Sequence, residues 1–150
     1  MNRNIIDILV ADDNDDDVLM IRKTFERSKL MNIVAAVSDG DEAMAYLRRQ
    51  GKYKDAAPPG LLLLDIKMPK MDGFETLAAI KADPALKRLP VVMLTTSRQE
   101  EDVCKSYAAG ACSFISKPVK FAQFQEIVNQ FALYWAVVAT IPRASSGWPP

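Results

Sequence analysis

The sequence predicts an α/β fold in which five parallel strands form one sheet, with helices wound over both of its faces. Five apolar runs have the length of a strand and lack the alternation of a half-exposed strand, so each fits a strand that is covered on both sides. A segment with helical spacing follows each run. The runs are "IIDILVA" (5–11), "NIVAAV" (32–37), "GLLLLD" (60–65), "PVVMLTT" (90–96) and "ACSFIS" (111–116), and the helical segments are 15–29, 41–50, 73–82, 98–108 and 120–139.

Turn-forming residues separate these elements without dividing the chain into domains. Asp39 and Gly40 open the second helix, and Gly110 follows the fourth helix as a stop. The sequence contains no internal repeat and no interdomain linker. At 150 residues the chain can bury a core without a metal or a disulfide. We therefore expect one domain over residues 1–142, followed by a tail without periodicity at 143–150.

The charges and the rare residue types exclude several classes of function. The 19 basic residues balance the 19 acidic ones and are scattered, so neither nucleic acid nor a membrane surface is an expected partner. The absence of histidine excludes histidine metal sites and general bases, and the two cysteines have no metal-type spacing. No apolar run has the length of a signal peptide or a membrane span. We expect a cytoplasmic protein whose thiols fill its interior.

The last predicted helix has an unusually broad apolar surface. One interpretation is a long core helix whose end is covered by the tail. The alternative is a surface for a partner or for a homodimer. The apolar positions are Phe121, Phe124, Ile127, Val128, Phe131, Tyr134, Trp135, Val138 and Ile141.

Polar side chains follow the strands at their carboxyl ends, where ligands and chemistry collect in an open parallel sheet. The run "LLLLDIKMPKMDGFE" (61–75) ends its buried strand on Asp65, and an ordinary turn is the simpler interpretation of that carboxylate. The same edge, however, is predicted to hold polar residues from four strands: Asp12, Asp13, Asp65, Thr95, Thr96 and Lys117. Ser38 and Asp39 are interpreted as helix caps, and Asp15–Asp17 as a cap and first turn.

Three carboxylates at one edge would repel one another unless a cation joined them. Because the available ligands are oxygens, a hard divalent ion such as Mg²⁺ is favoured, and Mg²⁺ often binds a substrate phosphate as well. A lysine ammonium and a threonine hydroxyl can each pair with a phosphoryl oxygen. The sequence offers no histidine, cysteine or serine nucleophile paired with a base. Asp65 is therefore the best nucleophile, and its attack on phosphorus would yield an aspartyl phosphate.

Together these residues resemble the motifs of response-regulator receiver domains of two-component signalling. The resemblance covers about residues 5–139 and rests on "ILVADDN", "LLLLDIKMPKMDGFE", "PVVMLTT" and "FISKP" in the family's order. It implies a doubly wound, flavodoxin-like fold with strand order 2-1-3-4-5 and five helices.

By the same resemblance, Asp65 is the phosphoacceptor and Mg²⁺ is the cofactor. Asp13 is implied to be a direct ligand of the ion, and Asp12 to bind it largely through water. The backbone carbonyl of Lys67 would complete the ligands from the protein.

The resemblance also implies a switch. Thr95 would carry the switch hydroxyl that responds to phosphorylation, and Phe114 would be the aromatic residue whose rotamer changes with it. Lys117 would pair with the phosphoryl group and precede a cis bond to Pro118. Phe114 stands where the family often has Tyr, so a packing switch survives while a hydrogen bond does not. The outcome would be altered protein binding at the face of the fourth helix, fifth strand and fifth helix.

Narrower features are similar to a group of stand-alone receivers that often work with phytochrome-type histidine kinases. They are "YLRRQGKYKDAAPPG", "LTTSRQEEDV" and an extended "YWAVVATIP" end. A sensor histidine kinase is then the expected phosphodonor, and a downstream protein is the expected partner. Lys67 and Ser97 occupy positions that tune dephosphorylation in the family, and a long cation at Lys67 could screen the phosphoryl group from water.

We expect a phosphoacceptor switch and not an enzyme that acts on other molecules. Two other functions compete with this interpretation. A phosphohydrolase of the haloacid-dehalogenase-like group needs a second Asp two residues after the nucleophile, where this chain has Lys67. A scaffold that works without phosphorylation would keep only the fold, although every reactive position is filled here.

Overall fold

A computed structural model confirms the five-stranded sheet and its strand order. It describes residues 5–26, 28–29, 31–106 and 113–129. All neighbouring strands are parallel, in the order β2-β1-β3-β4-β5. The strands are β1 (Ile6–Ala11), β2 (Met31–Val37), β3 (Leu61–Asp65), β4 (Val91–Thr95) and β5 (Ser113–Ser116).

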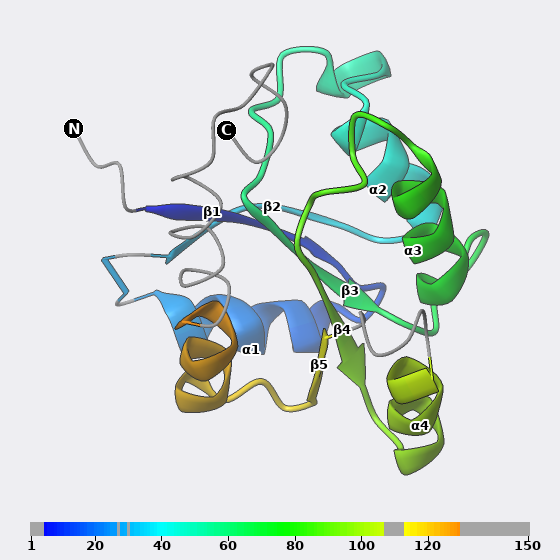
Figure 1. The fold of residues 1–150 in the computed structure, drawn as a ribbon. Coiled ribbons are helices and arrows are strands. Elements are labelled where there is room, and N and C mark those ends of the chain that lie inside the picture. Colours follow the sequence, from blue (N-terminus) through cyan, green and yellow to red (C-terminus); the bar gives the residue numbers. More distant parts are fainter. Residues whose placement is uncertain (1–4, 27, 30, 107–112, 130–150) are drawn as a thin grey trace, which may run out of the picture.

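Helices connect the strands and cover both faces of the sheet, as predicted. α1 and the helical residues 121–129 lie on one face, and α2, α3 and α4 lie on the other (Figure 1). With residues 121–129 this gives the five expected α-helices. The elements are α1 (Asp15–Phe25), α2 (Gly40–Leu47), the short 3₁₀ helix η1 (Gly51–Tyr53), α3 (Gly73–Ala82), α4 (Arg98–Ser106) and the helix that contains residues 121–129.

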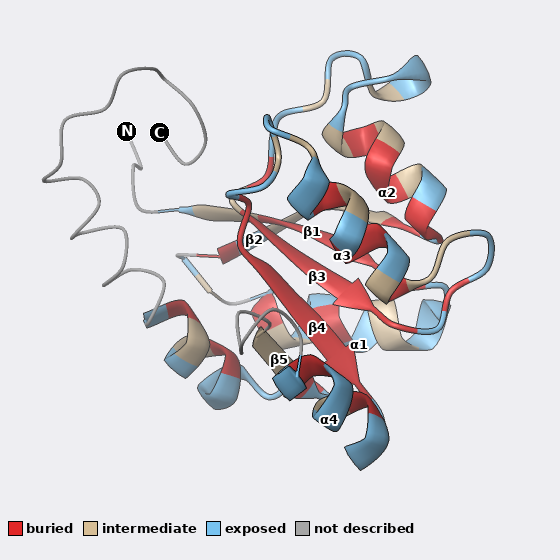
Figure 2. Cartoon of the chain, turned by 45° about the vertical axis from the view of Figure 1, so that its right-hand side comes forward, coloured by how far each residue is buried: buried red, intermediate tan, exposed pale blue. Residues whose placement is uncertain are grey.

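The four leucines of β3 divide between two hydrophobic cores. Leu62 and Leu64 belong to the core beneath α2, α3 and α4, whereas Leu61 and Leu63 belong to the core beneath α1 and residues 121–129. All four side chains are fully buried, and Figure 2 shows β3 and β4 buried along their length. Because burying one leucine contributes roughly 1.5–3 kcal/mol, this strand firmly anchors the carboxylate at its end.

The described part of the last helix packs its apolar side against α1. Phe124 is fully buried and Val128 nearly so, and the Phe124 ring lies 4.8 Å from the Phe25 ring between centroids. Phe121 contacts the same ring at 5.7 Å and stays 38% exposed. The core interpretation therefore holds for residues 121–129. The homodimer interpretation also depends on positions outside the described residues: Phe131, Tyr134, Trp135, Val138 and Ile141.

Two helices end earlier than their apolar spacing predicted. α1 ends at Phe25 and not at residue 29, because Ser28 begins the turn into β2 and its hydroxyl oxygen accepts a hydrogen bond from the first residue of that strand. α2 ends at Leu47 and not at residue 50, because Arg49 has a left-handed φ of 56°. Turn chemistry overrode the apolar pattern at both ends.

The helix starts follow capping residues in the sequence. Asp39 caps α2 by accepting a hydrogen bond from the Glu42 N–H, as predicted. α1 is capped by Asn14 and not by one of Asp15–Asp17, since Asn14 Oδ1 accepts from the Asp17 N–H at 2.9 Å. The three acids fill the first turn, where their charges match the helix dipole.

Several predictions for the C-terminal half remain without a structural test. The stop at Gly110 lies outside the described residues, and so does the boundary between a domain ending at residue 142 and the tail at 143–150. Within the described part of the chain, no helix is long and apolar enough to cross a membrane.

Two glycines allow the loop after β3 to lie very close to its neighbours. A β-carbon at Gly73 would come within 2.3 Å of the Asp65 carbonyl oxygen, and the Gly73 N–H donates to the Ile66 carbonyl at 2.7 Å. A β-carbon at Gly40 would come within 2.2 Å of Thr76 Oγ1. The backbone that carries Asp65 is thereby packed directly against the first turn of α3.

We expect Gly73→Ala to destabilise the fold by roughly 1–3 kcal/mol, because the added methyl group has no space beside the Asp65 carbonyl. Urea unfolding measures the change. Gly60→Ala is the matched control, since a β-carbon at Gly60 meets its nearest neighbour at an ordinary 3.6 Å. Equal urea midpoints for the two variants would contradict the close packing at Gly73.

Candidate functional site

Four strands deliver polar residues to one edge of the sheet, as predicted. Asp12 directly follows β1, Asp65 is the last residue of β3, Thr95 is the last residue of β4, and Lys117 directly follows β5. The Lys117 N–H donates to the Thr95 carbonyl at 2.8 Å, which fixes the chain after β5 beside β4. The bond from Lys117 to Pro118 is cis, as expected.

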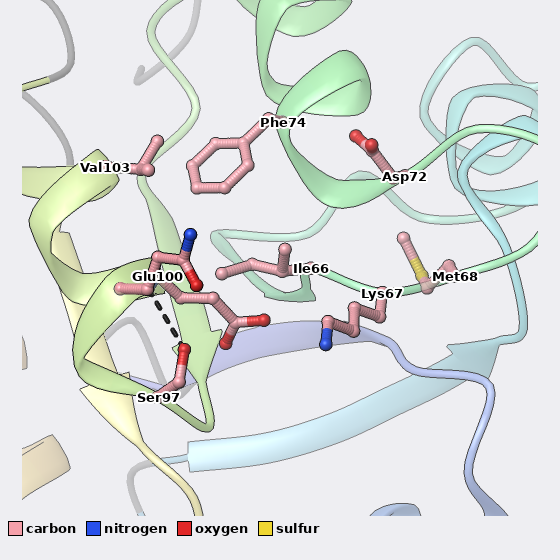
Figure 3. Close-up of a pocket in the computed structure, with 9 residues that line it drawn as sticks. Ile66, Lys67, Met68, Asp72, Phe74, Ser97, Glu100 and Val103 are labelled. Atoms are coloured by element: carbon pink, nitrogen blue, oxygen red, sulfur yellow. Dashed lines mark hydrogen bonds between the residues drawn. The ribbon is translucent and has the colours of Figure 1, made fainter.

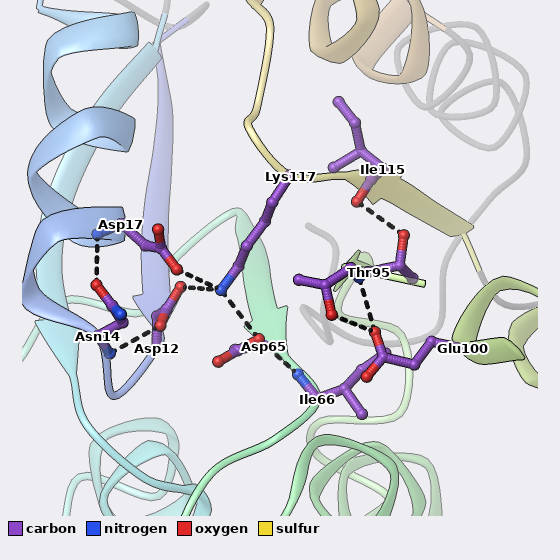
Figure 4. A network of polar contacts seen from close by, with 10 residues as sticks. Asp12, Asn14, Asp17, Asp65, Ile66, Thr95, Glu100, Ile115 and Lys117 are labelled. Atoms are coloured by element: carbon purple, nitrogen blue, oxygen red, sulfur yellow. Dashed lines mark hydrogen bonds and ion pairs between the residues drawn. The ribbon is translucent and has the colours of Figure 1, made fainter. Parts of the chain in front are cut away.

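The ammonium group of Lys117 lies between three carboxylates. Its Nζ is 2.8 Å from Asp12 Oδ2, 2.8 Å from Asp17 Oδ2 and 3.1 Å from Asp65 Oδ1, as Figure 4 shows. Asp17 was predicted only as part of the cap and first turn of a helix, and its contact with Lys117 was not predicted. The two residues are 100 positions apart, and no motif or spacing pairs them.

Burial and the neighbouring charges shift the pKa values of Asp65 and Lys117. Burial raises the pKa of Asp65 to about 6, the charge of Asp12 adds to the rise, and Lys117 opposes it. The pKa of Lys117 is raised as well: burial would lower it, but the close contacts with the carboxylates of Asp12 and Asp17 and the charge of Asp65 outweigh burial. Lys117 is therefore a permanent cation beside a carboxylate that ionises near neutrality.

The carboxylates of Asp12, Asp13 and Asp65 fit a divalent cation. One oxygen from each lies within 4.8 Å of the others. Asp12 Oδ2 is buried and receives no hydrogen bond of good geometry from the described residues, although Lys117 lies beside it. Asp13 is exposed and leaves the cluster open to solvent. An all-oxygen set with an open side suits Mg²⁺, which keeps several waters. Coordination by the Lys67 carbonyl stays a prediction.

The two predicted switch residues contact other residues than Asp65. Thr95 is fully buried, and its hydroxyl donates to the Ile115 carbonyl of β5 over 3.4 Å. Phe114 is half-buried and packs against the core beneath α2, α3 and α4. The Lys67 side chain is exposed and lines a pocket with Ser97.

One buried acid near the site, Glu100, was not predicted from the sequence. Glu100 is 9% exposed, and its Oε1 accepts hydrogen bonds from the N–H and the hydroxyl of Thr96. The sequence did contain a signal for part of this arrangement, because Ser97 and Glu100 form the Ser-x-x-Glu pattern of a capped helix start.

Residues 8–129 match the family model described as "Response regulator receiver domain", and this range includes every residue of the cluster around Lys117. The chain belongs to this family. The receiver domain predicted from four short motifs is thus confirmed over most of the sequence.

Known receivers of similar length resemble this chain along most of their own sequence. Response regulator Rcp1 of Synechocystis sp. is 36% identical over 137 residues, which covers 91% of this chain and 93% of Rcp1. A solved structure of Rcp1 in a Mn²⁺-bound form covers 92% of this chain and 99% of that one, at 36% identity and a TM-score of 0.66.

Two further solved structures carry names from phytochrome signalling. The bacteriophytochrome response regulator AtBRR is 39% identical, with a TM-score of 0.76 and coverage of 83% of this chain and 91% of its own. The phosphorylated cyanobacterial phytochrome response regulator RcpA is 41% identical, with a TM-score of 0.69 and coverage of 94% of this chain and 99% of its own.

We expect Mg²⁺ to bind this receiver roughly tenfold more weakly at pH 5 than at pH 7, because a proton competes with the ion for Asp65, whose pKa is about 6. Calorimetric titration at the two pH values measures the change. Asp65→Asn removes the competing proton, so its weaker binding should depend less on pH. Equal wild-type affinities at pH 5 and pH 7 would contradict the raised pKa.

Proposed function

We propose that this receiver domain takes a phosphoryl group from a sensor histidine kinase onto Asp65 in a Mg²⁺-dependent reaction, and that it signals by changing its binding to another protein. The observation that carries the proposal is the contact of Lys117 with Asp12 and Asp65, beside Asp13. Charges of both signs surround one nucleophile, which suits the transfer of a phosphoryl group.

Asp65 would supply the nucleophilic oxygen. Among the described residues, its polar contacts fall on Oδ1, from the Ile66 N–H at 2.9 Å and from Lys117 Nζ at 3.1 Å. Oδ2 is then available for attack. A bond forms between this oxygen and phosphorus while the bond from phosphorus to the kinase's histidine nitrogen breaks, and the nitrogen keeps the electron pair. The product is an acyl phosphate.

The surrounding residues would hold the charges of the transferred group. Asp12, Asp13 and Asp65 are the proposed metal ligands, with the carbonyl of Lys67 as a further one. A bound Mg²⁺ neutralises part of the charge on the phosphoryl oxygens. Lys117 would leave one of its present carboxylates and pair with a phosphoryl oxygen as a point charge. The chain's own chemistry would be limited to its phosphorylation and dephosphorylation.

A phytochrome-type histidine kinase is the proposed phosphodonor. Support comes from AtBRR and RcpA, both of which are described as phytochrome response regulators. The donor must bring its phosphorus to Asp65, so it must contact the elements around the sheet edge. On α1, Leu19 and Met20 are 51% and 55% exposed and offer an apolar contact there. A cytoplasmic location stays a prediction from the sequence.

The proposed output is a protein contact at the face formed by α4, β5 and the helix that follows. The 3.4 Å bond from Thr95 to Ile115 is long and weak, so a phosphoryl oxygen could draw the Thr95 hydroxyl toward Asp65. The space left beside β5 would admit the half-buried Phe114 ring.

A domain over residues 1–142 and a homodimer through the C-terminal helix are part of the same proposal.

The function is tested by intact-mass measurement after incubation with Mg²⁺ and acetyl phosphate or phosphoramidate. We expect one phosphoryl adduct in the wild type, none without Mg²⁺, and none in Asp65→Asn. Asp39→Asn is the matched control, because Asp39 is also nearly buried at this edge but lies outside the metal cluster. An adduct that persists in Asp65→Asn, or turnover of a generic phosphate ester, would contradict the proposal.

A second prediction concerns Lys67, two residues after the phosphoacceptor. Its exposed ammonium can screen the phosphoryl group from attacking water, so we expect the adduct to decay faster in Lys67→Ala than in the wild type. Decay is followed by mass after removal of the donor. Lys70→Ala removes the same charge from the same loop and should leave the decay unchanged. Unchanged or slower decay in Lys67→Ala would refute the screening role.

A further inference from the structure

Glu100 and the loop between β4 and α4 hold each other in place. The Glu100 carboxylate accepts from the Thr96 N–H at 2.7 Å and from the Thr96 hydroxyl at 3.2 Å, both on Oε1. Figure 4 shows this carboxylate turned back from α4 toward the end of β4. The acid is only 9% exposed, and burying a carboxylate to this extent is costly unless donors satisfy it.

This contact extends the capping box by one residue, as Glu42 does at the start of α2 by accepting from the Ser38 N–H, and it adds a bond to the Thr96 hydroxyl. In a capping box, the third helical residue accepts a hydrogen bond from the N–H of the cap residue. The cap residue here is Ser97, whose Oγ accepts from the Glu100 N–H at 3.1 Å. Glu100, however, accepts from Thr96, which precedes the cap, and binds its hydroxyl as well. The carboxylate therefore fixes the loop in addition to the start of the helix.

The loop that Glu100 fixes carries the predicted switch hydroxyl. In this arrangement the Thr95 hydroxyl faces Ile115, and both donors of Thr96 are bound to Glu100. A phosphoryl group on Asp65 would add about two negative charges and strong acceptors. It would draw N–H and O–H donors from the same loop, so it would compete with the Glu100 carboxylate for them.

A pocket beside the site gives the Glu100 carboxylate an alternative position. The pocket has a volume of about 650 Å³ and is lined by Glu100 and Ser97 on one side and by Ile66 and Lys67 on the other. Figure 3 shows the Glu100 and Lys67 side chains pointing toward each other across it. A Glu100 side chain that releases Thr96 can therefore approach a cation carried by the loop after Asp65.

We infer that Glu100 is a positioning residue: it holds the β4–α4 loop in the resting arrangement, and a phosphoryl group on Asp65 competes with it for the Thr96 N–H. The inference rests on the proposed function and adds an internal anion that opposes the phosphorylated arrangement. Removing the charge of Glu100 while keeping its shape weakens its hydrogen bonds, because those made by ionised groups are stronger. The loop then reaches the phosphorylated arrangement more easily.

Beryllofluoride, which mimics a phosphoryl group on a carboxylate, is the probe for this competition. Titration at saturating Mg²⁺, followed by NMR, compares the wild type with Glu100→Gln and Asp102→Asn. We expect Glu100→Gln to bind roughly fivefold more tightly, because the cost of releasing the loop falls. Asp102→Asn makes the same charge change at an exposed position of α4 and should bind like the wild type. Unchanged or weaker binding by Glu100→Gln would overturn the inference.

If Glu100→Gln does not fold, Thr96→Ala decides the question at an exposed position. It removes one of the two hydrogen bonds to Glu100, so it should tighten beryllofluoride binding by a smaller factor. Unchanged or weaker binding by this variant would overturn the inference in the same way.

Hydrogen exchange of the Thr96 amide in the protein without ligand separates failure of the inference from failure of the proposed function. We expect faster exchange in Glu100→Gln than in the wild type. If Glu100→Gln exchanges faster but the wild type binds no beryllofluoride, the proposed function is overturned, and the competition is overturned with it. Wild-type binding at Asp65 that Glu100→Gln leaves unchanged would overturn the role of Glu100 alone.

Discussion

One ammonium group holds together the edge of the sheet where the reactive residues meet. Lys117 Nζ lies within 3.1 Å of carboxylate oxygens of Asp12, Asp17 and Asp65, and Asp12 and Asp65 are almost fully buried. Removing one partner from a buried ion pair costs about 3–5 kcal/mol, because the other charge is left uncompensated. The buried carboxylates therefore need cations beside them. Lys117 is one, and a divalent ion can neutralise the remaining negative charge.

One side of this site is held by buried packing, whereas side-chain hydrogen bonds hold the other side. On the packed side, Asp65 ends a strand of four buried leucines, and its carbonyl is packed against Gly73. On the other side, the Thr95 hydroxyl is attached to β5 by a 3.4 Å hydrogen bond, and Thr96 is exposed and attached to Glu100. A new charge on Asp65 would therefore move the β4–α4 loop and not the strand that carries it.

The sequence was sufficient for features that follow from the sheet, and insufficient for those that depend on the reach of single side chains. Parallel strands end at one edge, so the proximity of Asp65 and Lys117 followed from strand assignment alone. The contact of Asp17 with Lys117 bridges 100 positions without any spacing rule. Glu100 belonged to a recognisable capping pattern, but that pattern does not tell whether the carboxylate binds the cap residue or the residue before it, nor that it also binds the Thr96 hydroxyl.

The most direct test of this account is a crystal structure of the protein with Mg²⁺ and beryllofluoride. We expect beryllium on Asp65, the ion between Asp12, Asp13 and Asp65, Lys117 Nζ on a fluorine atom, and the Thr95 hydroxyl turned away from the Ile115 carbonyl. Beryllofluoride bound to another residue would contradict the account. So would a structure in which Lys117 and Thr95 keep their present partners around an occupied Asp65.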